Sequence, residues 1–256
     1  MRKHPISAFV ITKNEADRID ACLASIATWV DQLVVMDSGS TDNTVALAKQ
    51  YTEEVYCTDW PGYGKQRNRA LAKCHHNWVL TIDADEVLSD AAKNEVDLLL
   101  AQENIPYTMI KFPWQTYLLH KPLRYGRFST PQGKLFNQQQ ACFTNGLVHE
   151  QIDMQEKRCH TTQGVLYHYS WRDYQHLQEK HLEYAHLQAS ERYLKGQRSN
   201  ITQALLGFIY SFFWQYIVRL GFINGSRGFM IAMTLAQYEL HRYLDMVCQE
   251  LDAQTT

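Results

Sequence analysis

The stretch WVLTIDADEVL, residues 78–88, decides the fold class. An apolar run leads to Asp83, and Asp85 and Glu86 follow within three residues. Short apolar runs of this kind are typical of strands that are buried on both faces of a sheet. Side chains two residues apart on a strand point the same way, so Asp83 and Asp85 can act together. The stretch therefore predicts a buried strand that ends in a cluster of carboxylates.

Strands and helices alternate through the first hundred residues. Strands are predicted at 6–12, 31–37, 54–58 and 78–84, and helices at 14–29, 38–51, 62–74 and 89–102. This alternation is typical of βαβ units and predicts an α/β fold with a largely parallel sheet. Such sheets bind ligands at the carboxyl ends of their strands. Polar residues gather at three of those ends, at 12–15, 37–40 and 83–86, and predict a ligand site there.

The second half of the chain has a different character. Runs at 107–119, 141–150 and 164–171 resemble strands joined by loops rich in Gly, Pro and Gln, and we expect an antiparallel extension that completes a cleft. Helices are predicted at 173–195, 200–219 and 226–250, with Asp173 near the start of the first and Gly196 after its end. We therefore expect one domain over 1–170, with halves 1–102 and 103–170, and a helical region over 171–256.

The segment ALLGFIYSFFWQYIV, residues 204–218, is unusually apolar. A membrane-spanning helix needs about 20 predominantly apolar residues, and this run has 15 before Arg219. The alternatives are a core helix, a helix lying in the plane of a membrane surface, and a helix that contacts a partner such as a second copy. Tyr and Trp in the run suit a membrane interface.

Charge and cysteine content narrow the function classes. The formal net charge is −2, which gives no case for nucleic-acid binding. Residues 1–100 carry a net −5 and residues 101–256 a net +3. None of the six cysteines forms a CxxC pair, so a zinc site is not indicated. The short apolar run near the N-terminus does not resemble a signal peptide, and we expect a reducing, cytoplasmic setting in which Cys22 and Cys57 are buried.

The carboxylates of residues 83–86 allow several functions. A pair such as Asp83 and Asp85 could bind a hard divalent cation and so stabilise a diphosphate leaving group. The string also matches the nucleophile motif of haloacid-dehalogenase-type phosphotransferases, in which the first Asp attacks a phosphoryl group. That chemistry needs a later acidic pair, and none follows Glu86. A solvated strand end, or a non-catalytic binding protein, remains the plainest alternative.

Four ordered motifs resemble those of the family-2 inverting glycosyltransferases. They are FVITKNEADRIDACLASI, VVMDSGSTDNT, GYGKQRNRAL and WVLTIDADE. Three later motifs, LVHE at 147–150, LYHYS at 166–170 and GFINGSRGFMIA at 221–232, resemble the subgroup that contains bacterial lipopolysaccharide inner-core glucosyltransferases. The resemblance implies a GT-A-type fold, a UDP-sugar donor such as UDP-glucose, a lipopolysaccharide core heptose or other glycolipid acceptor, and a divalent cation, Mg²⁺ or Mn²⁺.

The resemblance also implies roles for individual residues. It places Glu150 as the general base, Asp85 on the metal and His168 as a further metal contact. The residues implied to bind the nucleotide sugar are Thr12, Glu15, Asp37, Lys65, Gln66, Asn68, Asp83 and Ala84. An amphiphilic acceptor, together with the apolar segment 204–218, predicts peripheral contact with the cytoplasmic face of the inner membrane.

Overall fold

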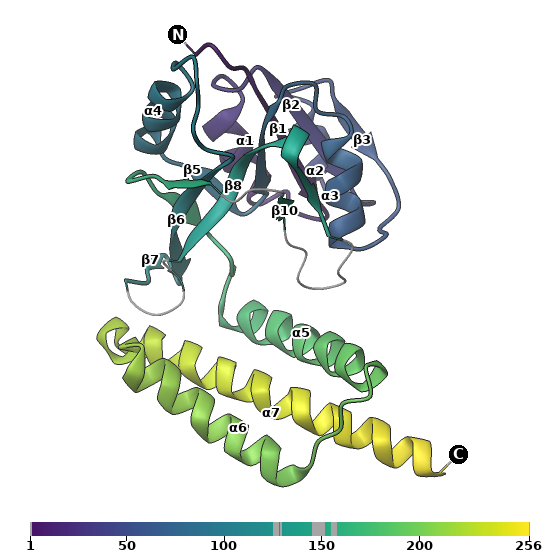
Figure 1. Cartoon of the computed structure of the whole chain (residues 1–256). Coiled ribbons are helices and arrows are strands. Elements are labelled where there is room, and N and C mark those ends of the chain that lie inside the picture. Colours follow the sequence, from purple (N-terminus) through teal and green to yellow (C-terminus); the bar gives the residue numbers. More distant parts are fainter. Residues whose placement is uncertain (1, 125–127, 129, 145–151, 155–157, 256) are drawn as a thin grey trace. The chain divides into compact units, whose positions relative to one another are not determined.

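The computed structural model describes residues 2–255 apart from 125–127, 129, 145–151 and 155–157. It falls into two compact units. Unit 1 contains residues 1–115 and 130–169, and unit 2 contains residues 116–129 and 170–256. Unit 1 is built around a sheet and unit 2 around three long helices (Figure 1).

Four strands of unit 1 form the predicted parallel sheet. They are β1 (Ile6–Thr12), β2 (Gln32–Asp37), β3 (Val55–Cys57) and β4 (Trp78–Asp83), in the order β3-β2-β1-β4. All three pairings are parallel. Each strand lies within a segment predicted from the apolar pattern, so the α/β prediction is confirmed.

Helices cover both faces of this sheet, which explains why its strands are apolar throughout. Alternate strand residues such as Val10 and Leu80 face α1 (Ile19–Ile26), α2 (Thr44–Ala48) and α4 (Asp90–Leu99). The intervening residues, such as Phe9 and Val34, face α3 (Tyr63–Leu71) on the other side. Side chains alternate along a strand, so both faces must be apolar when both are covered. The Ser89 hydroxyl caps α4 by accepting a hydrogen bond from the backbone N–H of Ala92.

Antiparallel strands extend the sheet beyond β4. They are β8 (Pro131–Asn137), β6 (Met109–Leu118), β12 (Leu166–His168) and β5 (Glu86–Leu88), in that order. Two short strands also pair with β6: β7 (Lys121–Pro122) is antiparallel to it, and β11 (Cys159–Thr161) is parallel. A separate pair joins β9 (Ala141–Phe143) to β10 (Ile152–Met154), and a short 3₁₀ turn, η2 (Gln138–Gln140), precedes β9. The predicted antiparallel extension is therefore present. The segment of β8, PQGKLFN, was expected to be a loop because of its Pro, Gln and Gly.

Unit 2 is a bundle of three helices. They are α5 (Tyr174–Leu194), α6 (Ile201–Phe213) and α7 (Ser226–Thr255). A π-helical turn, η3 (Trp214–Val218), continues α6, and a 3₁₀ turn, η4 (Gly221–Asn224), leads into α7. Asp173 caps the start of α5, and Gly196 follows its end with φ +81°, as predicted. Leu177, Ile231 and Leu235 pack in an apolar cluster with Trp171.

Cys57 corrects one sequence expectation. Cys22 is buried in α1 as expected, but Cys57 is exposed. The residue lies on β3, which is the edge strand of the sheet and has a neighbour on one side only. A short apolar run therefore did not reveal that this strand is less covered than β1 and β2.

Candidate active site

The carboxyl ends of β1, β2 and β4 meet at one edge of the parallel sheet. Thr12 pairs with Asp37 in the register of β1 and β2. Ile11, one residue earlier, pairs with Asp83 of β4. The sequence prediction that these strand ends converge is confirmed. This edge is where open α/β sheets bind their ligands.

Asp37 organises the turn that follows β2. Its carboxylate accepts hydrogen bonds from the backbone N–H groups of Gly39 and Ser40, both at 2.9 Å, and from the Ser40 hydroxyl. Gly39 has φ +83°, a conformation that glycine adopts without strain. The Gln66 amide of α3 lies against the same turn and donates to the Ser38 hydroxyl at 3.0 Å. Asp37 and Gln66 are both buried, so the turn is fixed from two sides.

Thr12 carries an unmatched hydroxyl at this edge. Its Oγ1 is buried and has no hydrogen-bond partner among the described residues. A buried hydroxyl without a partner costs free energy, so such an atom indicates a ligand position. Nearby, Glu15 is held by Arg18, whose Nε donates to the Glu15 carboxylate at 2.7 Å.

The other residues implied to bind the donor have varied surroundings. Lys65 is exposed on α3. The Asn68 amide exchanges two hydrogen bonds with the backbone of Phe143 and so ties α3 to β9. The Ala84 side chain is buried in the core, which leaves only its backbone to face a ligand. Glu150, the implied base, lies outside the residues that the structure describes.

Asp83 is held between two cations. Arg67 donates to one of its oxygens at 2.8 Å and Lys134 to the other at 2.7 Å. Burial by itself would raise the pKa of Asp83, but the charges of Arg67 and Lys134 outweigh it and hold this pKa well below its usual range. Asp83 is therefore a fixed anion, an arrangement that favours a positioning role over that of a phosphotransferase nucleophile.

Glu86 is fully buried next to Asp83 and Lys134. Its carboxylate accepts from the Asp83 backbone N–H at 2.9 Å, from Trp114 Nε1 at 2.8 Å and from Lys134, whose Nζ is 2.8 Å away. Burial raises the pKa of Glu86, although the Lys134 charge counters part of the effect. Asp83 belongs to β4, whereas Trp114 belongs to β6 and Lys134 to β8. Glu86 therefore connects the end of β4 to the antiparallel half of the sheet.

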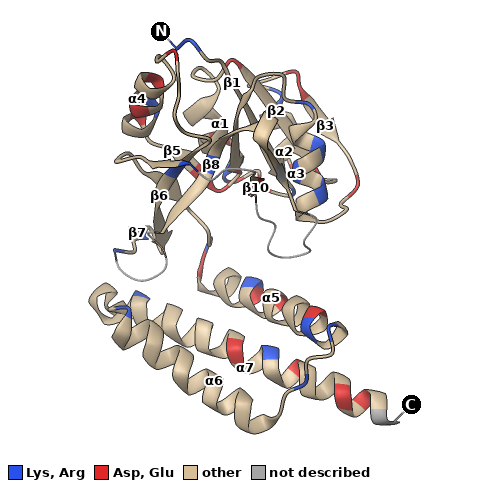
Figure 2. Ribbon diagram, viewed as in Figure 1, with Lys and Arg blue, Asp and Glu red and all other residues tan. Residues whose placement is uncertain are grey.

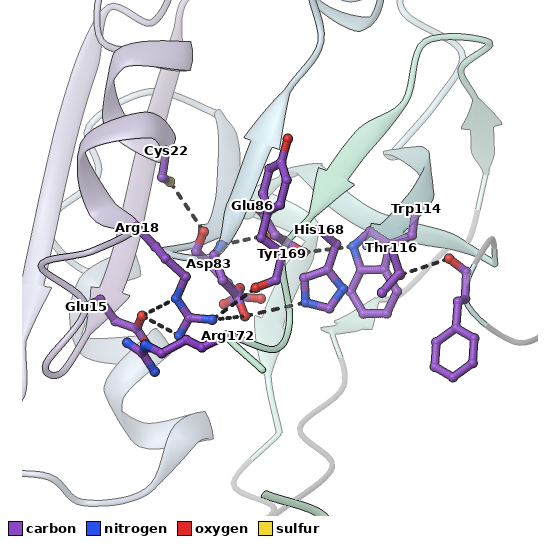
Figure 3. A network of polar contacts seen from close by, with 12 residues as sticks. Glu15, Arg18, Cys22, Asp83, Glu86, Trp114, Thr116, His168, Tyr169 and Arg172 are labelled. Carbon is purple, nitrogen blue, oxygen red and sulfur yellow. Dashed lines mark hydrogen bonds and ion pairs between the residues drawn. The ribbon is translucent and has the colours of Figure 1, made fainter. Parts of the chain in front are cut away.

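Asp85 occupies a different environment, although only one residue separates it from Asp83. His168 Nε2 is 3.6 Å from its Oδ2, and Arg18 NH1 is 3.7 Å from the same atom. His168 stacks on Trp114 with ring centroids 4.4 Å apart, as Figure 3 shows. Arg18 also donates to the Tyr169 carbonyl at 3.0 Å. Asp85 is thus bordered by an arginine and a histidine, whereas Asp83 is bordered by an arginine and a lysine.

Asp85 and His168 fit the role of metal ligands. A cation with ligands at about 2.0–2.2 Å joins atoms roughly 3 Å apart, so a small side-chain rotation would bring the two within range. His168 Nδ1 is buried without a hydrogen-bond partner among the described residues. No group of three or more Asp, Glu, His or Cys in the described chain could hold an ion. An ion here would therefore need oxygens from its substrate, as Mg²⁺ often does.

Sequence reasoning missed four contributors to this site: Arg18, Arg67, Lys134 and the support that Glu86 gives. One signal could have found Lys134. It is a lone charge followed directly by Leu135 and Phe136, and a charge inside an apolar strand must have a partner. The Trp114 contact with Glu86 depends on tertiary pairing and leaves no such trace.

Known proteins support a family assignment. The sequence model of the family described as "Glycosyl transferase family 2" matches residues 7–155. An uncharacterized glycosyltransferase of Rickettsia felis is 31% identical over 242 residues, which cover 90% of this chain and 85% of that protein. The lipopolysaccharide core biosynthesis glycosyltransferase LpsC of Rhizobium meliloti is 29% identical and covers 92% of this chain and 89% of its own.

A solved structure with a weaker spatial match is glucosyl-3-phosphoglycerate synthase from Mycobacterium tuberculosis in complex with Mg²⁺ and UDP. It has a TM-score of 0.37 and 27% identity, and the match covers 44% of each chain. The family match itself spans more than half of this sequence and contains the strand ends described above. This chain is an enzyme with the predicted GT-A-like architecture, and it belongs to glycosyl transferase family 2.

Proposed function

We propose that the protein transfers glucose from UDP-glucose to a heptose of the lipopolysaccharide inner core, with inversion at the anomeric carbon and with help from a divalent cation. The observation that carries the proposal is the contrast at the end of β4: Asp83 is clamped by two cations, whereas Asp85 lies beside His168. The full-length similarity to LpsC, whose name refers to lipopolysaccharide core biosynthesis, supports the acceptor class.

The donor would lie across the carboxyl ends of β1, β2 and β4. In this proposal Asp37 accepts a hydrogen bond from the uracil ring, and the unmatched Thr12 hydroxyl and Glu15 lie along the uridine. Lys65 and Gln66 belong to the segment that closes over base and ribose, and Asn68 supports it by holding β9. The fixed anion Asp83 would accept from the ribose hydroxyls, with the Ala84 backbone beside the diphosphate.

The metal would be held by Asp85 and His168 together with diphosphate oxygens. When bound there, it would supply positive charge that stabilises UDP as a leaving group. Arg67 and Lys134 already neutralise Asp83, and Asp85 is the carboxylate of the pair that lies beside the imidazole of His168. His168 needs its ring fixed to serve as a ligand, and stacking on Trp114 does this.

The transfer itself needs one base. In the proposal Glu150 takes the proton of the acceptor hydroxyl while the hydroxyl oxygen attacks the anomeric carbon. The bond from that carbon to the UDP oxygen breaks on the opposite face, so the electron pair leaves with UDP and the configuration inverts. Charge develops on the sugar as in other glycosyl transfers.

The proposal includes a cellular place, the cytoplasmic face of the inner membrane. A lipid-linked acceptor is confined to a membrane, and a nucleotide-sugar donor is soluble. An enzyme that joins them works best at the surface of that membrane.

Calorimetric titration tests the donor and metal assignments. UDP, UDP-glucose, UDP-galactose and UDP-N-acetylglucosamine would each be titrated with Mn²⁺ and with EDTA. We expect Mn²⁺-dependent binding with a preference for UDP-glucose. Asp85→Ala should lose the Mn²⁺-dependent part of UDP affinity, whereas Asp90→Ala, an exposed carboxylate close by, should keep it. Unchanged Mn²⁺ dependence in Asp85→Ala would move the metal elsewhere.

Glu150→Gln should lower the transfer rate by about 10²–10⁴-fold, the usual contribution of a general base, and leave UDP binding unchanged. The transfer assay uses UDP-glucose and a core lipopolysaccharide that ends in heptose. Full activity in Glu150→Gln would assign the base to another residue.

A further inference from the structure

Unit 2 presents a continuous apolar surface that no described residue covers. It is formed by α6, η3, η4 and the first turn of α7, and we call it the α6 face. Figure 2 shows α6 without a single charged residue along its length. The exposed apolar side chains of the α6 face are Ile201, Leu205, Leu206, Ile209, Tyr210, Phe213, Trp214, Ile217, Val218, Leu220, Phe222, Ile223 and Phe229.

Only one side of α6 packs inside the protein. Ala204 and Ser211 are buried, and Ser211 donates to the Leu235 carbonyl of α7. A Cβ on Gly207 would come within 2.9 Å of the Tyr243 ring, so the two helices approach closely on that side. The helical segment Ile201–Val218 has a mean hydropathy of 1.3, and only 6% of the segment is buried. This exposure rules out the core-helix interpretation of the segment.

The backbone is closely packed at the tip of the α6–α7 hairpin. A Cβ on Gly228 would lie 1.8 Å from the Gly221 carbonyl oxygen, and a Cβ on Gly221 would lie 2.5 Å from the Gln215 carbonyl oxygen. These positions therefore require glycine. The tight packing of the tip leaves Phe222 and Ile223 exposed at the end of the hairpin.

The chain segment that forms the α6 face carries charge of one sign. No Asp or Glu occurs between Glu191 and Glu239, a stretch that contains Arg192, Lys195, Arg198, Arg219 and Arg227. Arg219 is exposed at the end of η3, beside the apolar tip. Basic residues next to a membrane-facing apolar surface are attracted by anionic lipid headgroups.

The neighbouring helices exclude a spanning orientation. α7 lies along α6, and α5 lies along α7 through contacts such as Gln178 to Thr234 and Tyr238 to Gln188. A bilayer core around α6 would therefore also enclose charged residues of α5, among them Glu179, Lys180 and Glu183. Charges at that depth are costly and rare. An in-plane orientation keeps α5 in water.

We propose that the α6 face binds an anionic phospholipid bilayer, with α6 lying in the plane of the surface and the η4 tip inserted beside Arg219. Apolar area supplies the binding, and the surrounding arginines favour anionic over zwitterionic lipid. This proposal assigns residues and an orientation to the membrane contact. It does not depend on the donor, the metal or the acceptor sugar.

Vesicle flotation of the full chain without any substrate tests the proposal. We expect the protein to float with vesicles of phosphatidylglycerol and phosphatidylethanolamine, and less with phosphatidylcholine vesicles or at high salt. Leu206→Glu should weaken binding at least about tenfold, since a charge in the apolar contact is unfavourable. The matched control is Leu98→Glu, which changes an exposed leucine on α4 of unit 1 and should float like the wild type.

Arg219→Glu provides a second variant that leaves the apolar area unchanged. It should reduce binding to anionic vesicles and leave the weak binding to phosphatidylcholine unaltered, while circular dichroism verifies folding of each variant. Failure of the wild type to float would overturn the proposal. If the wild type then sediments as a dimer that Leu206→Glu dissociates, a second copy covers the α6 face instead. Transfer to a delipidated acceptor, measured separately, tests the proposed function without involving the membrane.

Discussion

Unit 1 buries charged side chains, whereas unit 2 exposes apolar ones, and each differs in this way from an ordinary soluble protein. Unit 1 buries charges: Glu86 is inaccessible to solvent, and Lys134 lies between it and Asp83. Unit 2 exposes apolar side chains along α6, which carries no charged residue. Buried charges are rare in soluble proteins unless they are paired, as they are in unit 1, and large exposed apolar surfaces are also unusual.

The two units differ in whether their unusual side chains are satisfied within the chain. In unit 1 the buried charges balance one another, which fixes the strand end in one geometry before a ligand arrives. In unit 2 no described residue covers the α6 face, and we propose an anionic bilayer as its partner. Stability measurements should therefore respond strongly to changes in the first region and weakly to changes in the second.

The largest effect is expected from Lys134→Met. The change leaves the buried Glu86 and the partly exposed Asp83 as neighbouring carboxylates without their shared cation, and breaking a buried ion pair on one side costs about 3–5 kcal/mol. Urea unfolding would measure the free energy of unfolding. The control, Lys3→Met, removes an exposed ion pair with Glu103 and should cost at most about 1 kcal/mol. Equal costs for the two variants would contradict the buried, mutually dependent charges that distinguish unit 1.

A matched pair of leucine truncations sharpens the contrast. Leu80→Ala removes a fully buried side chain from β4 and should cost about 2–5 kcal/mol. Leu206→Ala removes a side chain that is 61% exposed on α6 and should change the free energy of unfolding by no more than about 0.5 kcal/mol in lipid-free buffer. A large loss for Leu206→Ala would mean that α6 packs against protein in solution.

The smallest of the three effects depends on pH. Asp83→Asn should cost about 1.5–3 kcal/mol at neutral pH, the contribution of hydrogen bonds to a charged group. The folded pKa of Asp83 lies below the unfolded value of about 3.9, so its stabilisation is complete above that value and is lost as pH falls. The difference in free energy of unfolding between the wild type and Asp83→Asn should therefore become smaller below about pH 4.

Urea unfolding between pH 3 and pH 7 would follow that difference. Asp59→Asn, which changes an exposed aspartate paired with Arg69, should show little difference from wild type at any pH. A difference that stays constant down to pH 3 would contradict the assignment of the acid sensitivity to Asp83.

Much of the parallel half of the fold could be predicted from the sequence. Its strands are continuous apolar runs because helices cover both faces, and capping residues such as Ser89 and Asp173 mark helix starts by local hydrogen bonds. These signals are local, so one sequence is enough to show them. The exposure of Cys57 was missed because an edge position depends on strand order.

The residues at the strand ends of the candidate site could be predicted from the sequence, but those that depend on strand order could not. Thr12, Asp37 and Asp83 follow from the strand ends, which the βαβ pattern brings together. The clamp on Asp83 depends on β8, a strand whose Pro131 and Gly133 are typical of a loop. Antiparallel insertion of β8 beside β4 puts Lys134 next to Asp83, and no local pattern encodes that pairing.

The thiol of Cys22 gives the strand end a chemical property of its own. Its S–H group donates to the Asp83 carbonyl at 3.3 Å. Burial, reinforced by Glu86, Asp85 and Asp83, raises the pKa of this thiol well above its usual value. Oxidants and alkylating reagents attack the thiolate, which is suppressed here. The end of β4 is thus protected from oxidation at Cys22, while the exposed Cys57 and Cys248 remain open to reagents.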